Sequence, residues 1–207
     1  MKTVLIVLAI LILLPIVKQL LVFGLARLIG RAIGQAALNQ QPDRISLTPA
    51  GKDAWKNADA ANGLAEPLLS RGFRDAGVHR ITEMPGVVVQ LLAKPEECFY
   101  AAIYEHPQVG CWMDLATRYT NGNGSTFTTS KPTGLSPRPG HPMVHSPGTG
   151  PLALYARARA ERIRDAMHAT TVERAVSDFE ESYAESTAWR KSKGISACEV
   201  AEVAKAA

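Results

Sequence analysis

An alternation of apolar side chains over residues 86–130 strongly limits the folds open to this 207-residue chain. The alternating positions are Phe99, Ala101 and Ile103 in one segment and Cys111, Met113, Leu115 and Tyr119 in the next. Because side chains two residues apart lie on the same side of a strand, this pattern predicts half-buried strands. A reversal at residues 106–110 and the Asn-Gly pairs of residues 121–124 would fold three or four strands back on one another. Residues 125–130 are therefore expected to pair antiparallel with the preceding strand.

With 46% hydrophobic and 20% charged residues, the composition suits one soluble domain of about 150 residues and a separate hydrophobic segment. The net charge is +4, but acidic residues are interspersed with the basic ones along the chain. Nucleic-acid binding is not indicated, because the sequence has no dense basic patch with interleaved aromatic residues. Cys98, Cys111 and Cys198 form no CxxC pair, and their odd number favours a reducing compartment.

The N-terminal segment is the most hydrophobic part of the sequence. Residues 3–26 are mostly apolar and as one helix would span about 36 Å, enough for a bilayer core of roughly 30 Å. Lys18 lies off the centre, so its long stem can reach the head groups. A cleaved signal peptide is the alternative, but no small-residue cleavage site follows the apolar run at the usual distance. We therefore predict an anchor helix within residues 1–34.

An anchor of this kind predicts a single-pass protein of the cell inner membrane, with the lipid bilayer and a membrane protein as partners. Lys2 precedes the apolar run and Arg27 and Arg31 follow it, a bias that favours a cytoplasmic soluble domain. Arg157 and Arg159 belong to an arginine-rich segment predicted to be helical. These two residues, with Arg27 and Arg31, are predicted to contact the membrane surface, and a solvated helix face is the alternative.

Several boundaries can be predicted before the alternating region. Residues 35–47 are polar and are interpreted as a linker. The pair Thr48 and Pro49 suits a helix start, so a helix is expected to run from there toward Arg71. Residues 73–83 are predicted to form the first strand.

The C-terminal part changes from a proline-rich segment to helices. Six of the thirteen prolines fall within residues 131–151, so no strand is expected there, and the loop is interpreted as either functional or disordered. One helix is predicted to start at Pro151 and a second to end near Gly194. Ser196 and Glu199 have the spacing of a capping box, which predicts a short final helix.

Strands followed by helices predict an α+β fold rather than an alternating parallel one. The predicted architecture is an N-terminal transmembrane helix followed by an antiparallel β-meander sheet of four or five strands packed with helices. The soluble domain is expected to comprise residues 48–207.

Polar side chains on one face of this sheet form a candidate ligand-binding surface. Its residues are Tyr100, Tyr104, His106, Asp114 and Arg118, with His141 and His145 on the loop that would close over it. Asp114 and Arg118 are not expected to pair directly, because same-face neighbours along a strand are already about 7 Å apart. The alternative is a polar, solvated sheet face.

Neither a metal site nor a catalytic centre is predicted. His141 and His145 are four residues apart, but Pro142 and Pro147 oppose a helix there, and no acidic or cysteine ligand is nearby. We therefore predict no metal and no cofactor. Cys98 or Cys111 with His106 is a poor nucleophilic pair, because a strand cysteine without an oriented base is usually inert.

Three segments, YEHPQVGCWMDL, the NGNG turn and SPRPGHP, resemble parts of small, single-pass bacterial membrane proteins of an uncharacterised family. The resemblance covers about residues 73–194. It implies a shared fold and no activity.

Two functions from different classes follow from these observations. The first is a membrane-tethered interaction or accessory module, because no constellation of nucleophile, base and oxyanion donors is present. The second is a membrane-anchored small-ligand binder or enzyme that uses the polar sheet face. A concave pocket at that face would favour the second, and a flat, filled face would favour the first.

Overall fold

The computed structural model describes residue 32 and residues 34–206. Contacts divide the chain into two compact units. The first comprises Met1–Gln41, Thr133–Ser136 and Arg190–Ala207, and the second comprises Pro42–Pro132 and Pro137–Trp189. Residues 34–40 of the first unit are helical. The second unit contains the entire sheet.

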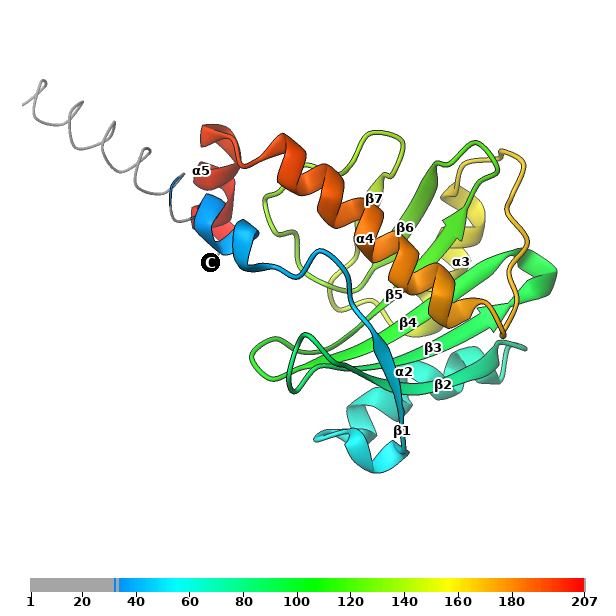
Figure 1. The fold of residues 1–207 in the computed structure, drawn as a ribbon. Coiled ribbons are helices and arrows are strands. Elements are labelled where there is room, and N and C mark those ends of the chain that lie inside the picture. Colours follow the sequence, from blue (N-terminus) through cyan, green and yellow to red (C-terminus); the bar gives the residue numbers. More distant parts are fainter. Residues whose placement is uncertain (1–31, 33, 207) are drawn as a thin grey trace, which may run out of the picture. The chain divides into compact units, whose positions relative to one another are not determined.

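The sheet has seven strands, which follow one another in space in the same order as in the sequence (Figure 1). They are β1 (Leu47–Ala50), β2 (Arg74–Ile81), β3 (Val88–Lys94), β4 (Phe99–His106), β5 (Gly110–Arg118), β6 (Gly124–Thr128) and β7 (Met143–His145). Strands β1 to β6 pair antiparallel, whereas β7 pairs parallel with β6. The sheet is therefore mixed, and larger than the predicted antiparallel meander of four or five strands.

The predicted strands and hairpins of residues 73–130 are confirmed. β4 ends at His106 and β5 begins at Gly110, whose φ of +85° is readily available to glycine. In the next hairpin the Asn121 side chain accepts a hydrogen bond from the Asn123 amide (3.0 Å), and Gly122 has a φ of +81°. β6 then pairs antiparallel with β5, as the Asn-Gly pairs predict.

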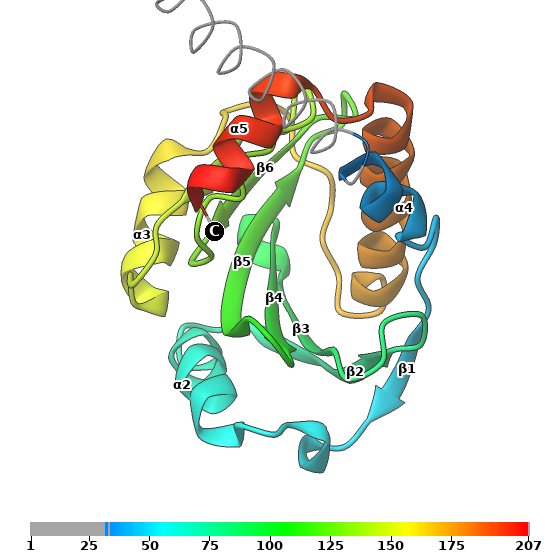
Figure 2. The ribbon, with the colours of Figure 1, turned by 90° about the vertical axis from the view of Figure 1, so that its left-hand side faces the viewer.

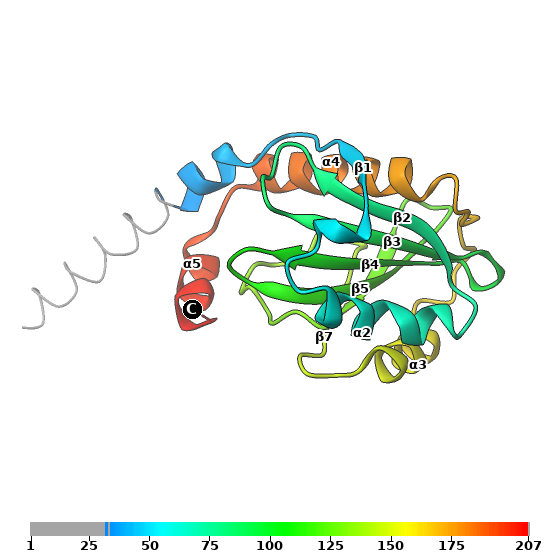
Figure 3. The ribbon, with the colours of Figure 1, turned by 90° about the horizontal axis from the view of Figure 1, so that it is seen from below.

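Helices cover both faces of the sheet, as Figures 2 and 3 show. One face packs against α2 (Ala58–Leu69) and α3 (Pro151–Glu161), and the other lies under α4 (Ala175–Lys193). Large buried side chains of the core on this first face include Phe99, Ile103, Met113, Leu115 and Phe127 from the sheet, with Leu68 from α2 and Leu154 from α3. The two-residue alternation thus places one set of side chains in a filled core beneath α2 and α3 and directs the other set toward α4.

The predicted transmembrane architecture is corrected. Within residues 32 and 34–206, no helix is long and apolar enough to cross a membrane. The α4 helix has 19 residues but carries acidic and basic side chains along its length, as the sequence AVSDFEESYAESTAWRKSK shows. The fold class is therefore α+β without a membrane span in the described part, and the single-pass membrane assignment is wrong there. Residues 3–26, on which the anchor prediction depends, lie outside the described residues.

Two local predictions are also wrong. Thr48 and Pro49 belong to β1, and α2 starts only after Asn57, whose side chain accepts a hydrogen bond from the Ala60 amide (3.1 Å). Pro49 is tolerated because β1 is an edge strand, where a residue whose N–H position faces away from the neighbouring strand loses no hydrogen bond of the sheet. The proline-rich loop contains β7, since three consecutive non-proline residues suffice to pair with β6 and proline carbonyls still accept hydrogen bonds.

The predicted C-terminal helix boundaries are largely confirmed. Pro151 is the first residue of α3, and α4 ends at Lys193, immediately before Gly194. α5 (Ala197–Ala206) starts with the predicted capping box. The Ser196 amide donates to the Glu199 carboxylate (2.9 Å), and the Glu199 amide donates to the Ser196 hydroxyl (3.2 Å).

The start of α2 depends on one buried carboxylate from β4. Glu105 is 6% exposed and accepts hydrogen bonds from the amides of Lys56 (2.7 Å) and Asn57 (2.8 Å). We predict that Glu105→Ala lowers the free energy of unfolding by about 3 kcal/mol, because two backbone donors lose a charged acceptor. Urea denaturation of the full chain measures this change.

Glu161→Ala is the matched control, because its carboxylate pairs with Arg157 on an exposed helix surface. Its expected effect is below about 1 kcal/mol. Equal destabilisation by the two variants would contradict the role of Glu105.

Candidate ligand-binding cavity

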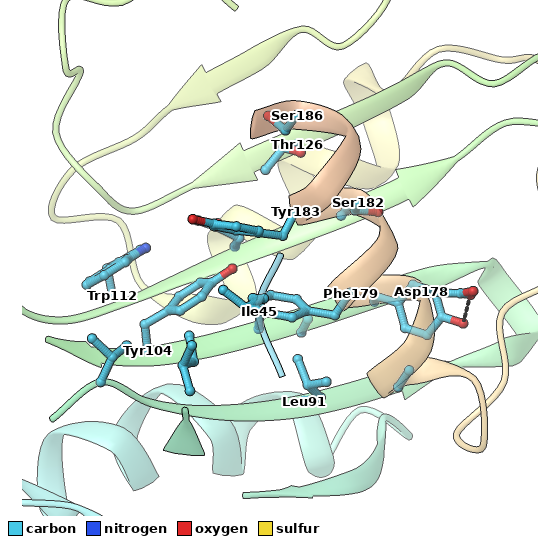
Figure 4. Close-up of a pocket in the computed structure, with 18 of the residues that line it drawn as sticks. Ile45, Leu91, Tyr104, Trp112, Thr126, Asp178, Phe179, Ser182, Tyr183 and Ser186 are labelled. Carbon is cyan, nitrogen blue, oxygen red and sulfur yellow. Dashed lines mark hydrogen bonds between the residues drawn. The ribbon is translucent and has the colours of Figure 1, made fainter. Parts of the chain in front are cut away.

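A cavity of about 390 Å³ lies in the second unit, between the sheet and α4 (Figure 4). All five predicted sheet-face residues line it: Tyr100, Tyr104, His106, Asp114 and Arg118. The register explains their convergence, because Asp114 on β5 lies opposite Ala102 on β4, and Tyr104 lies opposite Trp112. Small side chains, Ala102 and Ala116, alternate with the larger ones and leave room above the strands.

One end of the cavity has aromatic walls. Tyr104 and Trp112 stack with ring centroids 4.7 Å apart and an interplanar angle of 14°. Phe179 of α4 lies 6.1 Å from Tyr104, centroid to centroid. Figure 4 shows these three side chains and Tyr183 gathered in the space between the strands and the helix. Stacked rings of this kind present a rigid, largely apolar surface.

The other end is an ion-pair network that connects α4 to the sheet. Asp178 is 3% exposed and accepts a hydrogen bond from the Tyr100 hydroxyl (2.7 Å). It also pairs with Arg174 (3.0 Å) and Arg118 (3.8 Å). Burial, and secondarily the bond to Asp178, raises the pKa of Tyr100 to about 12. Tyr100 is therefore a protonated donor at neutral pH.

Arg118 continues this network along α4 and does not pair with Asp114. Its guanidinium lies 3.0 Å from the Glu181 carboxylate and 3.8 Å from that of Glu185. Arg138 also pairs with Glu185 (3.0 Å). Asp178, Glu181 and Glu185 of α4 are thus matched by three arginines.

Asp114 is the charged residue of the cavity that lacks such a partner. Its Oδ1 atom is buried and has no hydrogen-bond partner among the described residues. Burial raises the pKa of Asp114 to about 6, and nearby Thr128, Tyr104 and His145 only partly oppose this shift. The pKa of Tyr104 is raised well above its ordinary value, first by burial and then by the Asp114 charge.

This arrangement can bind and hold a proton but is a poor nucleophilic centre. Asp114 exchanges its proton near pH 6, and the phenols of Tyr100 and Tyr104 act as hydrogen-bond donors. Burial, and then the nearby Glu105, raises the pKa of Cys111, so its thiol is not activated. Within the part of the chain that the structure describes, no three potential metal-ligating side chains cluster.

The remaining predicted site residues lie elsewhere. His145 is on β7 with its Nδ1 3.1 Å from the Ser130 carbonyl oxygen, and neither His141 nor His145 lines the cavity. Arg157 pairs with Glu161 (3.0 Å). Arg159 pairs with Glu97 (2.8 Å). Arg27 and Arg31 lie outside the described residues.

Several lining residues were not predicted from the sequence. They are the α4 residues Phe179, Ser182, Tyr183 and Ser186, together with Ile45, Met84 and Val87 from the region of β1 to β3. The spacing of Phe179 and Tyr183 indicates one face of a helix. That signal could have identified the face of α4 that points to the sheet, but not which face of the sheet it covers.

Comparison with known proteins yields no relative. None of the family models, curated proteins or solved structures compared with the chain matches it.

The raised pKa of Asp114 predicts a pH-dependent effect on stability. The folded protein binds this proton more tightly than the unfolded chain, whose ordinary aspartate pKa is 3.8. The contribution of the proton to stability is therefore present at low pH and is lost as the pH rises through about 4 to 6. Asp114→Asn cannot ionise, so its stability relative to the wild type should rise by up to about 3 kcal/mol between pH 4 and pH 7.

Urea denaturation at pH 4, 5, 6 and 7 measures this difference. The exposed Asp53→Asn variant controls for the loss of one negative charge. A pH dependence equally large in both variants, or absent from Asp114→Asn, would refute the assignment to Asp114.

Proposed function

We propose that the second unit is a small-molecule-binding domain that holds a mainly apolar ligand between the sheet and α4. The observation that carries this proposal is the cavity of about 390 Å³ with its stacked Tyr104 and Trp112. Small-molecule sites are concave, mostly apolar and about 300–1,000 Å³ in volume. A few polar groups among apolar walls, here Asp114 and Tyr100, fix the orientation of a ligand.

The volume of the cavity supports a ligand-binding site rather than a packing defect. A water molecule occupies about 30 Å³ of liquid, and protein interiors have few voids larger than one water. The opposite face of the same sheet follows this rule, because Phe99, Ile103 and Met113 are fully buried there. This cavity thus lies on the face that carries small and polar side chains.

The concave shape favours a ligand binder over an interaction module. A flat, filled sheet face would have supported the module. Instead, all five residues proposed for the ligand-binding surface line one cavity. The favoured ligand is a small molecule with an apolar body, because the walls are largely aromatic and aliphatic.

An uncharged fluorescent dye tests this function. We expect N-phenyl-1-naphthylamine to bind the full-length chain at one saturable site, with an increase in dye emission as it enters an apolar environment. Ala116→Phe should abolish this saturable signal, because the ring would fill the cavity floor. Fluorescence titration measures both results.

Val109→Phe is the matched control, because it adds an equally large apolar side chain at an exposed position of the β4–β5 hairpin. It should leave dye binding unchanged. Thermal unfolding verifies that both variants are folded. Failure of the folded wild type to bind the dye saturably, or binding that persists in folded Ala116→Phe, would refute the proposed function.

A further inference from the structure

The charges that line the cavity do not cancel. Asp178 is paired with Arg174 and Arg118, and Glu181 and Glu185 on the same helix are paired with Arg118 and Arg138. Asp114 lies outside this network, and its Oδ1 has no hydrogen-bond partner among the described residues. The uncompensated charge of the cavity is therefore negative and belongs to one carboxylate.

A buried carboxylate oxygen without a donor is energetically unfavourable. Leaving such a group unpaired costs more than an ordinary hydrogen bond contributes, so buried charges are normally paired. Hydrogen bonds with the Thr128 and Tyr104 side chains and the nearby His145 compensate the Asp114 carboxylate only in part, because burial still raises its pKa. Asp114 also lines the cavity, so a ligand group that brings its own proton donor and positive charge would pair with this carboxylate.

The aromatic walls suit the same kind of group. The faces of tryptophan and tyrosine rings attract cations, and this attraction is stronger where water is excluded. Tyr104, which stacks on Trp112, also interacts electrostatically with Asp114, so the rings and the carboxylate are close together. The Phe179 ring of α4 lies 6.1 Å from the Tyr104 ring, centroid to centroid.

We propose that the cavity recognises an organic cation, a protonated amine on an apolar body, whose ammonium group pairs with Asp114 while the body lies against Tyr104, Trp112 and Phe179. This inference depends on the proposed ligand-binding function and specifies its ligand class. An anionic ligand fits poorly, because it would face the Asp114 carboxylate while Arg118 is already shared among three acidic side chains.

Three ligands with one skeleton test the charge preference directly. They are 3-phenylpropylamine, 3-phenylpropanol and 3-phenylpropanoate, which carry ammonium, hydroxyl and carboxylate groups at neutral pH. Each is titrated against the full-length chain preloaded with N-phenyl-1-naphthylamine, and displacement of the dye gives its affinity. We expect the amine to bind at least about tenfold more tightly than the alcohol, since a charge-assisted hydrogen bond contributes about 1.5–3 kcal/mol. The carboxylate should bind most weakly.

Asp114→Asn removes the charge with almost no change in shape. The preference of the folded variant for the amine over the alcohol should disappear, whatever its affinity for the dye. If the wild type binds the dye but does not prefer the amine, or if Asp114→Asn binds the dye and keeps the preference, the inference is wrong and the proposed function stands. If the wild type fails to bind the dye, the proposed function itself fails.

The pH dependence gives a second measurement that does not require the variant to fold. The ratio of amine to alcohol affinity should rise as the pH increases from 5 to 7, because Asp114 ionises with a pKa of about 6. The other titratable or charged groups that face Asp114 or line the cavity are Tyr104, His145, His106, Arg118 and Asp178. His145→Gln and His106→Gln should keep the trend. A ratio that is flat with pH, or a trend lost in either histidine variant, would contradict the role of Asp114.

Discussion

The hydrogen-bonded ladder of strands β2 to β6 is the constraint on which the rest of the structure depends. Its antiparallel register divides the side chains between two faces, and both faces are covered by helices. A shift of one residue would exchange the two sets. The register therefore determines which side chains fill the core beneath α2 and α3 and which side chains face α4.

The two faces differ in the size and polarity of their side chains, and this difference produces the cavity. Beneath α2 and α3, large apolar side chains such as Phe99, Met113 and Phe127 fill the interior. On the α4 side, the same strands contribute Ala102, Asp114 and Ala116. The helix is held above these small and polar residues by polar contacts, including that of Glu180 with the Leu47 amide. The space that remains is bounded by aromatic rings.

Asp114 connects stability with the proposed function. A large apolar side chain in its place would fill the space and remove an unfavourable buried charge, as on the opposite face. Buried polar groups without a hydrogen-bond partner are typical of functional sites, where such a group lowers stability but contributes to ligand binding. The orphaned Oδ1, the raised pKa and the neighbouring aromatic rings all occur at this one position. For this reason the cavity, rather than the exposed arginines of α3, is the candidate functional site.

The sequence by itself determined the local structure: the alternating strands, the two hairpins, the capping box of Ser196 and Glu199, and the shared face of Tyr100, Tyr104, His106, Asp114 and Arg118. These features depend on side-chain period and turn chemistry within a few residues, so they can be predicted without knowledge of the fold. Only the tertiary structure decided that α4 covers this face and that Arg118 pairs with α4 while the Oδ1 atom of Asp114 remains without a hydrogen-bond partner among the described residues. It also decided that β7 joins the proline-rich loop to the sheet. The transmembrane prediction used only the hydrophobicity of residues outside the described part, and no helix of that part meets the requirement for a membrane span. The cavity depends on contacts between residues far apart in sequence, such as Tyr104 with Phe179, 75 positions apart, and Tyr100 with Asp178, 78 positions apart. Periodicity within a strand or a helix carries no information about such distant partners.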